Sequence, residues 1–82
     1  MSDWIETPQD LRLELRTPDF MSGVDLVRRI AEVAEAQNHH PDLELGWGYL
    51  RIRLSTHDSG GVTERDRRLA EALSPILETL RA

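Results

Sequence analysis

The sequence contains no cysteine, which excludes disulfide bonds and thiolate-bound zinc as supports for the fold. It also contains no lysine: all ten basic residues are arginine, they lie scattered along the chain, and the formal net charge is -5. We therefore expect no nucleic-acid partner, because nucleic acids select a concentrated basic surface. A chain of 82 residues buries only ~60–65% of its surface on folding. Its core is therefore thin, and self-association is the support that remains.

Long hydrophobic runs are missing as well. No apolar stretch approaches the ~18–20 residues that span a membrane, and the opening segment MSDWIETPQD lacks the basic and apolar parts of a signal peptide. We therefore expect a cytoplasmic protein with no membrane partner. Hydrophobic residues make up 39% of the chain and charged residues 30%, which is typical of a globular protein. No repeat, linker or low-complexity segment divides the chain, so residues 1–82 are interpreted as a single domain.

Period-two alternation of apolar and polar residues predicts the strands. It occurs at residues 11–16, 42–47 and 50–55, and each segment would have one buried face. The segment GWGY at residues 46–49 suits a hairpin turn between the last two strands. A short extended segment at residues 4–6 is interpreted as a further strand before the first of these.

Two amphipathic helices are predicted from apolar spacings of three and four. The stripe of the first consists of Phe20, Val24, Val27, Ile30, Ala31 and Ala34, widened by Leu26 and Val33. Because Pro41 disfavours helical geometry at the residue before it, this helix should end near Asn38 or His39. The second helix should open with a capping box at residues 63–66 and carry the stripe Leu69, Leu73, Ile76, Leu77 and Leu80. Pro75 predicts either a kink, which we favour, or a restart with Ser74 as the cap.

The predicted order is therefore β-β-α-β-β-α. Hairpins between neighbouring strands imply a four-stranded antiparallel sheet, with both helices packed on one of its faces. This is an α+β fold. The other face of the sheet would carry charges of both signs, which can pair across strands.

The three histidines are the strongest candidates for chemistry. His39 and His40 are adjacent in the segment EAQNHHPD, and His57 follows in STHDSGG. An imidazole can gain or lose a proton near neutral pH, which general acid–base catalysis requires. His39 follows the last helical turn and Pro41 forces His40 into extended geometry, so the two rings should point in different directions and line two walls of a cavity.

Structural roles and a metal site are the alternatives. His39 could serve only as a cap of the helix, Glu35 as a solvated surface charge, and Asp66 as the acidic half of the capping box. Imidazoles with Glu35 or Asp66 could bind zinc, but an adjacent histidine pair lacks the i, i+4 spacing of helical zinc motifs. Residues 60–61 are a glycine pair without a phosphate-binding fingerprint. We expect neither a metal nor any other cofactor.

The spacing of these residues resembles the signature of the pterin-4a-carbinolamine dehydratases. The series consists of Glu35, His39, His40, Pro41, Trp47, His57 and Asp66, within the segments NHHPDLE and LSTHDSGGVTERD. The resemblance covers the chain loosely from Trp4 to its end. It implies a dehydratase that converts 4a-hydroxytetrahydropterin to quinonoid dihydropterin in tetrahydropterin recycling, without a metal or redox cofactor.

The resemblance also implies roles for individual residues. His39 and His57 would be the principal acid and base, with His40 as a third catalytic residue that helps to bind substrate. The substrate-binding or orienting residues would be Glu35, Asp66, Trp47 and Thr56. The resemblance further implies a homodimer or homotetramer, although the family's leading helix is expected to be missing here. The alternative is a non-catalytic interaction or assembly factor on the same fold, but three histidines together with two carboxylates favour catalysis.

Overall fold

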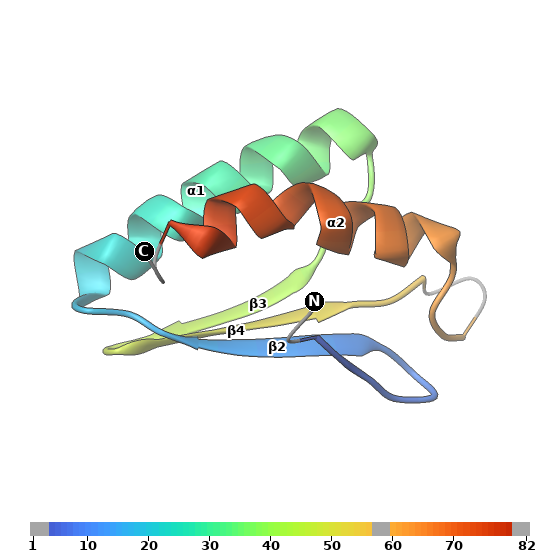
Figure 1. Ribbon diagram of the computed structural model, residues 1–82, viewed down its shortest axis with the longest axis horizontal. Helices are drawn as coiled ribbons and strands as arrows, with labels where there is room; N and C mark the ends of the chain where they lie inside the picture. The colour runs from blue at the N-terminus through green and yellow to red at the C-terminus, as the bar shows by residue number, and fades with distance from the viewer. Residues whose placement is uncertain (1–3, 57–59, 80–82) are drawn as a thin grey trace.

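The computed structural model describes residues 4–56 and 60–79, and its element order confirms the predicted β-β-α-β-β-α arrangement. The strands are β1 (Ile5–Glu6), β2 (Leu11–Arg16), β3 (Asp42–Gly46) and β4 (Tyr49–Leu54). They form one antiparallel sheet in the order β1-β2-β4-β3. Helices α1 (Phe20–Gln37) and α2 (Glu64–Glu78) lie over the same face of this sheet (Figure 1). No helix in the described part of the chain is long and apolar enough to cross a membrane.

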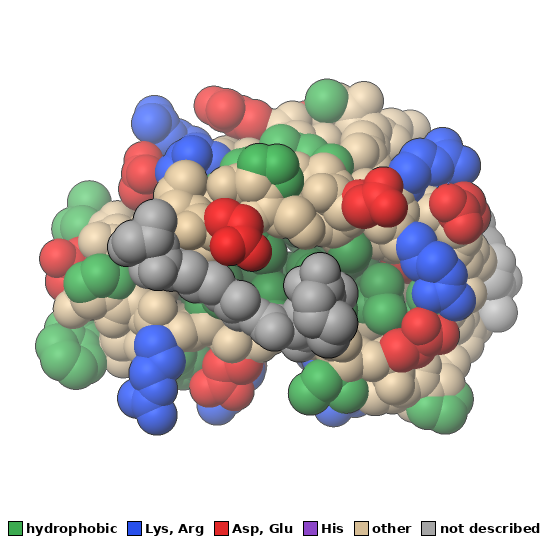
Figure 2. Space-filling model, in the orientation of Figure 1, with side chains coloured by type: hydrophobic (Ala, Val, Ile, Leu, Met, Phe, Trp, Pro, Cys, Tyr) green, Lys and Arg blue, Asp and Glu red, His purple; other side chains and the backbone are tan. Residues whose placement is uncertain are grey.

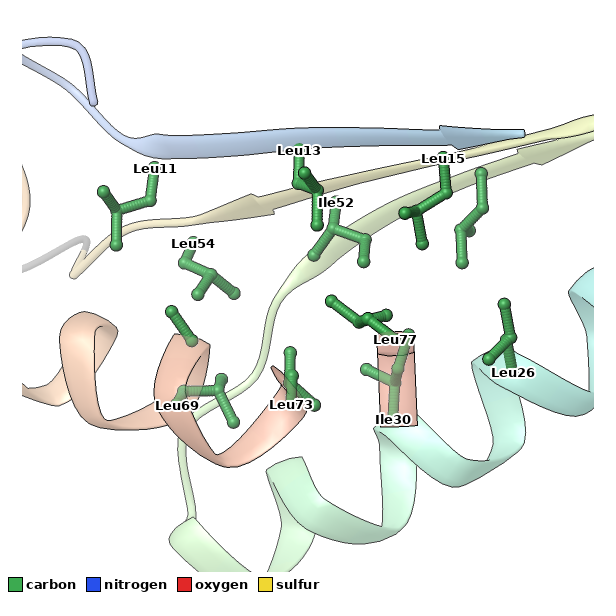
Figure 3. Close-up of a cluster of buried hydrophobic side chains, with 12 residues drawn as sticks. Leu11, Leu13, Leu15, Leu26, Ile30, Ile52, Leu54, Leu69, Leu73 and Leu77 are labelled. Atoms are coloured by element: carbon green, nitrogen blue, oxygen red, sulfur yellow. The ribbon is translucent and has the colours of Figure 1, made fainter. Parts of the chain in front are cut away.

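The hydrophobic core fills the space between the sheet and the two helices. β2 and β4 point every second side chain toward the helices, as their period-two patterns predict (Figure 3). The buried side chains of the cluster include Leu11, Leu13, Leu15, Leu50, Ile52 and Leu54 from the sheet, and Leu26, Ile30, Leu69, Leu73 and Leu77 from the helices. This packing holds the two helices against the sheet and so sets where their ends lie.

The face of α1 that packs inward differs from the predicted stripe. Its buried residues are Gly23, Leu26, Ile30 and Ala34, whereas Phe20 is 44% exposed and Ala31 is exposed. The prediction was wrong at these last two positions. At Gly23 the helix packs close to β3, where an added Cβ atom would lie 2.6 Å from Cδ1 of Leu45. Phe20 and Ala31 lie to one side of the buried line that Gly23, Leu26, Ile30 and Ala34 form along the helix, and they therefore stay exposed.

The open face of the sheet carries paired charges, as predicted. Arg51 lies opposite both Glu14 and Glu44 in the sheet register, and its guanidinium nitrogens are 3.4 Å and 3.0 Å from their carboxylate oxygens. On the side of the molecule shown in Figure 2, acidic and basic side chains are interspersed.

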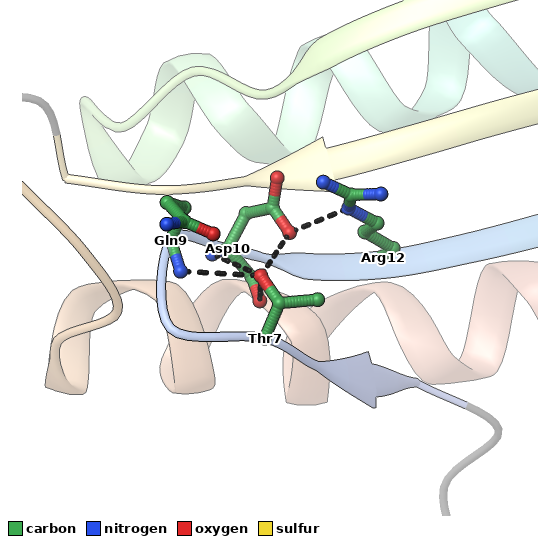
Figure 4. Close-up of polar contacts among 4 residues, drawn as sticks. All are labelled: Thr7, Gln9, Asp10 and Arg12. Atoms are coloured by element: carbon green, nitrogen blue, oxygen red, sulfur yellow. Dashed lines mark hydrogen bonds and ion pairs between the residues drawn. The ribbon is translucent and has the colours of Figure 1, made fainter.

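A polar cluster holds the turn between β1 and β2 (Figure 4). The hydroxyl of Thr7 accepts hydrogen bonds from the backbone N–H groups of Gln9 at 3.1 Å and Asp10 at 3.0 Å. Arg12 Nε donates to Asp10 Oδ1 at 2.7 Å. Burial raises the pKa of the Asp10 carboxyl, but the hydrogen bonds from Arg12 and Thr7 outweigh burial and leave this pKa below its ordinary value.

α2 continues through Pro75 from Glu64 to Glu78, which excludes the restart at Ser74. Instead of capping a new helix, the Ser74 hydroxyl donates a hydrogen bond to the carbonyl oxygen of Ala70, four residues earlier, at 3.3 Å. At the other end of α2, Thr63 and Asp66 form the predicted capping box. The start of α2 is therefore well defined, and this matters because Asp66 belongs to the candidate site.

Candidate active site

Four element ends meet at one end of the molecule. They are the end of α1, the start of β3, the end of β4 and the start of α2 (Figure 1). A cleft of about 340 Å³ opens among them. It is lined by Asn38, His39, His40, Pro41, Asp42, Ser55, Thr56 and Arg65. The adjacent histidines of the sequence therefore face a cavity, as their spacing predicts.

The end of α1 separates the two adjacent imidazoles. Asn38 adopts the left-handed conformation, with φ of 52°, and its N–H group bonds to carbonyl oxygens of the last helical turn. His39 follows with its ring buried, at 8% exposure, whereas the side chain of His40 is 54% exposed. The two rings reach different partners, so the predicted divergence of the pair is observed.

His39 makes a buried contact with α2. Its Nε2 atom lies 2.5 Å from Oδ1 of Asp66, and Asp66 has no exposed surface. A charge buried this completely is tolerated when it is paired and hydrogen-bonded. Asp66 thus has both roles that the sequence left open, because it belongs to the capping box and also contacts a candidate catalytic imidazole.

The second oxygen of Asp66 is also satisfied. Oδ2 accepts a hydrogen bond from the Thr56 hydroxyl at 2.8 Å and another from the backbone N–H of Thr63 at 2.9 Å. Burial raises the pKa of the Asp66 carboxyl, but the hydrogen bonds from His39, Thr63 and Thr56 outweigh it and hold this pKa below its ordinary value. Asp66 is therefore an ionised carboxylate near neutral pH, and an ionised carboxylate can only accept hydrogen bonds.

His40 and Glu35 form a second histidine–carboxylate pair in a different environment. His40 Nε2 lies 2.6 Å from Glu35 Oε2, and their side chains are 54% and 75% exposed. Solvent and salt weaken such a pair far more than they weaken the buried one. The arrangement suits a group at the mouth of the cleft that contacts a ligand.

Arg65 is a cleft residue that the sequence analysis missed. Its Nη2 atom donates a hydrogen bond to the backbone carbonyl oxygen of Asn38 at 2.8 Å, so it ties the first turn of α2 to the end of α1. The available signal was its position directly before Asp66, on the helix whose capping box the sequence does reveal.

Among the described residues that were predicted for the site, Glu35 and Asp66 contact the cleft histidines without lining the cleft, and Trp47 lies elsewhere. Trp47 lies in the β3–β4 turn, 77% exposed, at the opposite end of the sheet (Figure 1). His57 lies outside the described residues, directly after Thr56. Among residues 4–56 and 60–79, no group of three or more His, Cys, Asp or Glu is placed to hold a metal ion.

Comparisons with known proteins identify relatives of this chain. The family model described as Pterin 4 alpha carbinolamine dehydratase matches residues 1–76. A Mycolicibacterium smegmatis protein named "Putative pterin-4-alpha-carbinolamine dehydratase" is 42% identical over 90% of this chain and 79% of its own length.

Two solved structures have a similar fold. A transcriptional coactivator/pterin dehydratase from Brucella melitensis superposes with a TM-score of 0.82 at 25% identity, covering 90% of this chain and 81% of its own. A pterin dehydratase-like protein described as a RuBisCO assembly factor of the alpha-carboxysome superposes with a TM-score of 0.75 at 19% identity. That match covers 93% of this chain and 90% of the other, and it concerns the fold alone. On the family model and the sequence identity, the chain belongs to the pterin-4a-carbinolamine dehydratase family.

Proposed function

We propose that this protein dehydrates 4a-hydroxytetrahydropterin to quinonoid dihydropterin in tetrahydropterin recycling, by general acid–base catalysis at His39. The observation that carries the proposal is the contact between His39 Nε2 and the buried carboxylate of Asp66, made by an imidazole that lines a cleft. Membership of the dehydratase family supports the choice of substrate.

The dehydration combines two proton transfers with the cleavage of one C–O bond, and it involves no oxidation or reduction. An imidazolium donates a proton to the 4a-hydroxyl, the C4a–O bond breaks, and its electron pair leaves with water. A neutral base takes the proton from a ring N–H, and the electrons of that N–H bond form the new C=N double bond. Asp66 is proposed to hold and orient the His39 ring in this cycle through their contact. His57 is proposed as the second acid–base group on the family resemblance alone, and which histidine is the acid stays open.

The remaining site residues are proposed to bind and orient the substrate. His40 lines the cleft and is hydrogen-bonded to Glu35, and we propose that this exposed pair contacts the edge of a pterin. Thr56 is proposed to orient Asp66 through its 2.8 Å hydrogen bond. Trp47 can be an orienting residue only if another copy of the chain supplies it, because its own turn lies at the far end of the sheet.

A non-catalytic interaction or assembly role is the alternative. One of the solved structures with a similar fold is described as a RuBisCO assembly factor, so the fold also occurs in a protein described as having an assembly role. The His39–Asp66 pair favours catalysis, because a carboxylate with a perturbed pKa beside an imidazole at a cleft is typical of sites that transfer protons. The expected cytoplasmic location stays a prediction that cell fractionation would test.

Turnover of freshly generated 4a-hydroxytetrahydropterin by the purified protein tests the proposal. Carbinolamine dehydration is expected to occur spontaneously, so the control is the rate in the same buffer without protein. We expect a clear increase over that background. A folded protein that gives no increase would transfer our preference to the interaction role.

A further inference from the structure

The hydrogen bonds around Asp66 determine where each shared proton lies. An ionised carboxylate only accepts, so both His39 Nε2 and Thr56 Oγ1 must donate to it. Thr56 has one hydroxyl proton, and that proton is committed to Asp66 Oδ2. The Thr63 hydroxyl, 2.7 Å from Thr56 Oγ1, must then donate to Thr56. The protons run in one direction, from Thr63 through Thr56 to Asp66.

Two donors therefore hold Oδ2, which leaves Oδ1 for His39. The Thr56 hydroxyl and the Thr63 N–H bind Oδ2 from two elements, the end of β4 and the start of α2. Rotation of the carboxyl group would break both bonds in a fully buried position, where an unsatisfied polar group is costly. A proton on Nε2 makes the hydrogen bond to Oδ1, whereas a neutral ring with its proton on Nδ1 would place two acceptors in contact.

We propose that Thr56 and Thr63 are positioning residues that act on His39 through Asp66. They keep the neutral ring of His39 in the tautomer protonated at Nε2. Nδ1 is then the atom that exchanges a proton with a bound molecule. The role in turnover rests on the proposed dehydratase function, whereas the tautomer is a property of the free protein. Among the described residues, Asp66 is the side-chain partner of His39 and takes Nε2, and His39 lines the cleft, so we assign Nδ1 as the ring nitrogen that meets a ligand there.

Long-range proton–nitrogen NMR of the imidazole rings tests the proposal directly. The spectrum is recorded on the intact protein without ligand, in the neutral state of the ring, and His39→Gln identifies the resonances of His39. We expect the wild-type ring to carry its proton on Nε2. A wild-type ring protonated at Nδ1 would overturn the proposal, even if every variant failed to fold.

Asp66→Asn should reverse the tautomer. Its amide oxygen is expected to stay with the donors from Thr56 and Thr63, which turns the NH2 group toward His39. Nε2 must then accept, and the proton moves to Nδ1. Adding Thr56→Val removes one donor from the amide oxygen, so the reversed tautomer should become less populated, while Thr56→Ser should preserve it. If the Asp66→Asn protein and the Asp66→Asn, Thr56→Val double variant show the same tautomer populations at His39, a positioning role for Thr56 is contradicted.

Turnover of the single variants separates this inference from the proposed function. Thr56→Val should lower turnover roughly 2- to 13-fold, which is the rate factor that corresponds to the free energy of one ordinary hydrogen bond. Thr56→Ser keeps the hydroxyl and should have close to wild-type turnover. Thr79→Val is the matched control, because the Thr79 hydroxyl bonds to Ile76 at the far end of α2. If His39 has the expected tautomer but the protein shows no turnover, the proposed dehydratase function is refuted and this inference is not. If turnover is normal but His39 has the opposite tautomer, this inference is refuted and the proposed function is not.

Discussion

Nε2 of His39 lies 2.5 Å from Oδ1 of Asp66, and this buried contact joins the end of α1 to the first turn of α2 across 27 residues of sequence. The proposed acid–base group is therefore also part of the packing between the helices. His39 lies beyond the C-cap of α1 and outside the apolar stripes of the helices, yet removing its ring would leave a fully buried carboxylate without one of its partners.

His39→Ala and His39→Gln should differ in stability. Alanine removes one partner of a buried pair, which typically costs ~3–5 kcal/mol of unfolding free energy. Glutamine can still donate from its amide nitrogen to Asp66, so its loss should be about 1 kcal/mol, the range of one altered hydrogen bond. Urea unfolding followed by circular dichroism measures both. Equal losses for the two variants would mean that the hydrogen bond to Asp66 contributes little to folding.

Asp66 should make stability depend on pH in the acid range. Its pKa is lower in the folded protein than the ordinary value of 3.8, so the folded state binds this proton more weakly than the unfolded chain does. The resulting stabilisation is fully present above that ordinary value, and it is lost as the pH falls through the folded-state pKa. Wild type should therefore have a higher unfolding free energy than Asp66→Asn at neutral pH. This difference between the two proteins should be smaller near pH ~3.

Urea titrations of both proteins at the two pH values provide this comparison. Asp10 and Asp19 also have lowered pKa values, but both are present in the two proteins and their effects cancel in the difference. A difference that stays constant or widens on acidification would show that the Asp66 carboxylate is not stabilised by its hydrogen bonds.

Glu35→Gln should have a small effect on stability and a moderate one on turnover. The His40–Glu35 pair is exposed, and exposed ion pairs are typically worth ~0–1 kcal/mol. Its proposed role is to orient substrate, so the variant should raise KM more than it lowers kcat. Steady-state kinetics with added salt as a second variable would measure this. A loss of kcat as large as that of His39→Gln would instead place Glu35 among the groups that transfer protons.

The protein should be at least a dimer. The core between one sheet and two helices is thin, and β3 forms an edge of the described sheet, with backbone groups free to pair on one side. Analytical ultracentrifugation at micromolar concentration gives the assembly state. A stable, fully folded monomer would contradict this prediction and would also remove Trp47 from the proposed site.

Local signals explain what could be predicted from the sequence. The alternation of leucines with charged residues predicts β2 and β4, Pro41 gives an upper limit close to the observed end of α1, and the capping box predicts the start of α2. Each of these features depends on residues close together in the chain. The family resemblance added the identity of the site residues, and the structure brings His39, Thr56 and Asp66 together.

Features that depend on distant contacts were missed. The inward face of α1 includes Gly23, which packs close to Leu45, and a hydrophobicity pattern does not count a glycine as a buried position. Trp47 continues the alternation of β3 into the turn, so its exposure was not evident from spacing. The Thr63 hydroxyl contacts Thr56 only because the end of β4 and the start of α2 meet, which no local motif reveals.

The most direct test of the account is the rate at which freshly generated 4a-hydroxytetrahydropterin loses water with wild type and with His39→Gln, at equal concentrations of folded protein. A positioned acid or base is typically worth ~10²–10⁴-fold, so the catalysed rate should fall by about that factor, down to the spontaneous floor. The Gln side chain can keep the hydrogen bond to Asp66, so this loss would reflect proton transfer rather than unfolding. A folded His39→Gln protein that dehydrates the pterin at the wild-type rate would contradict the central claim.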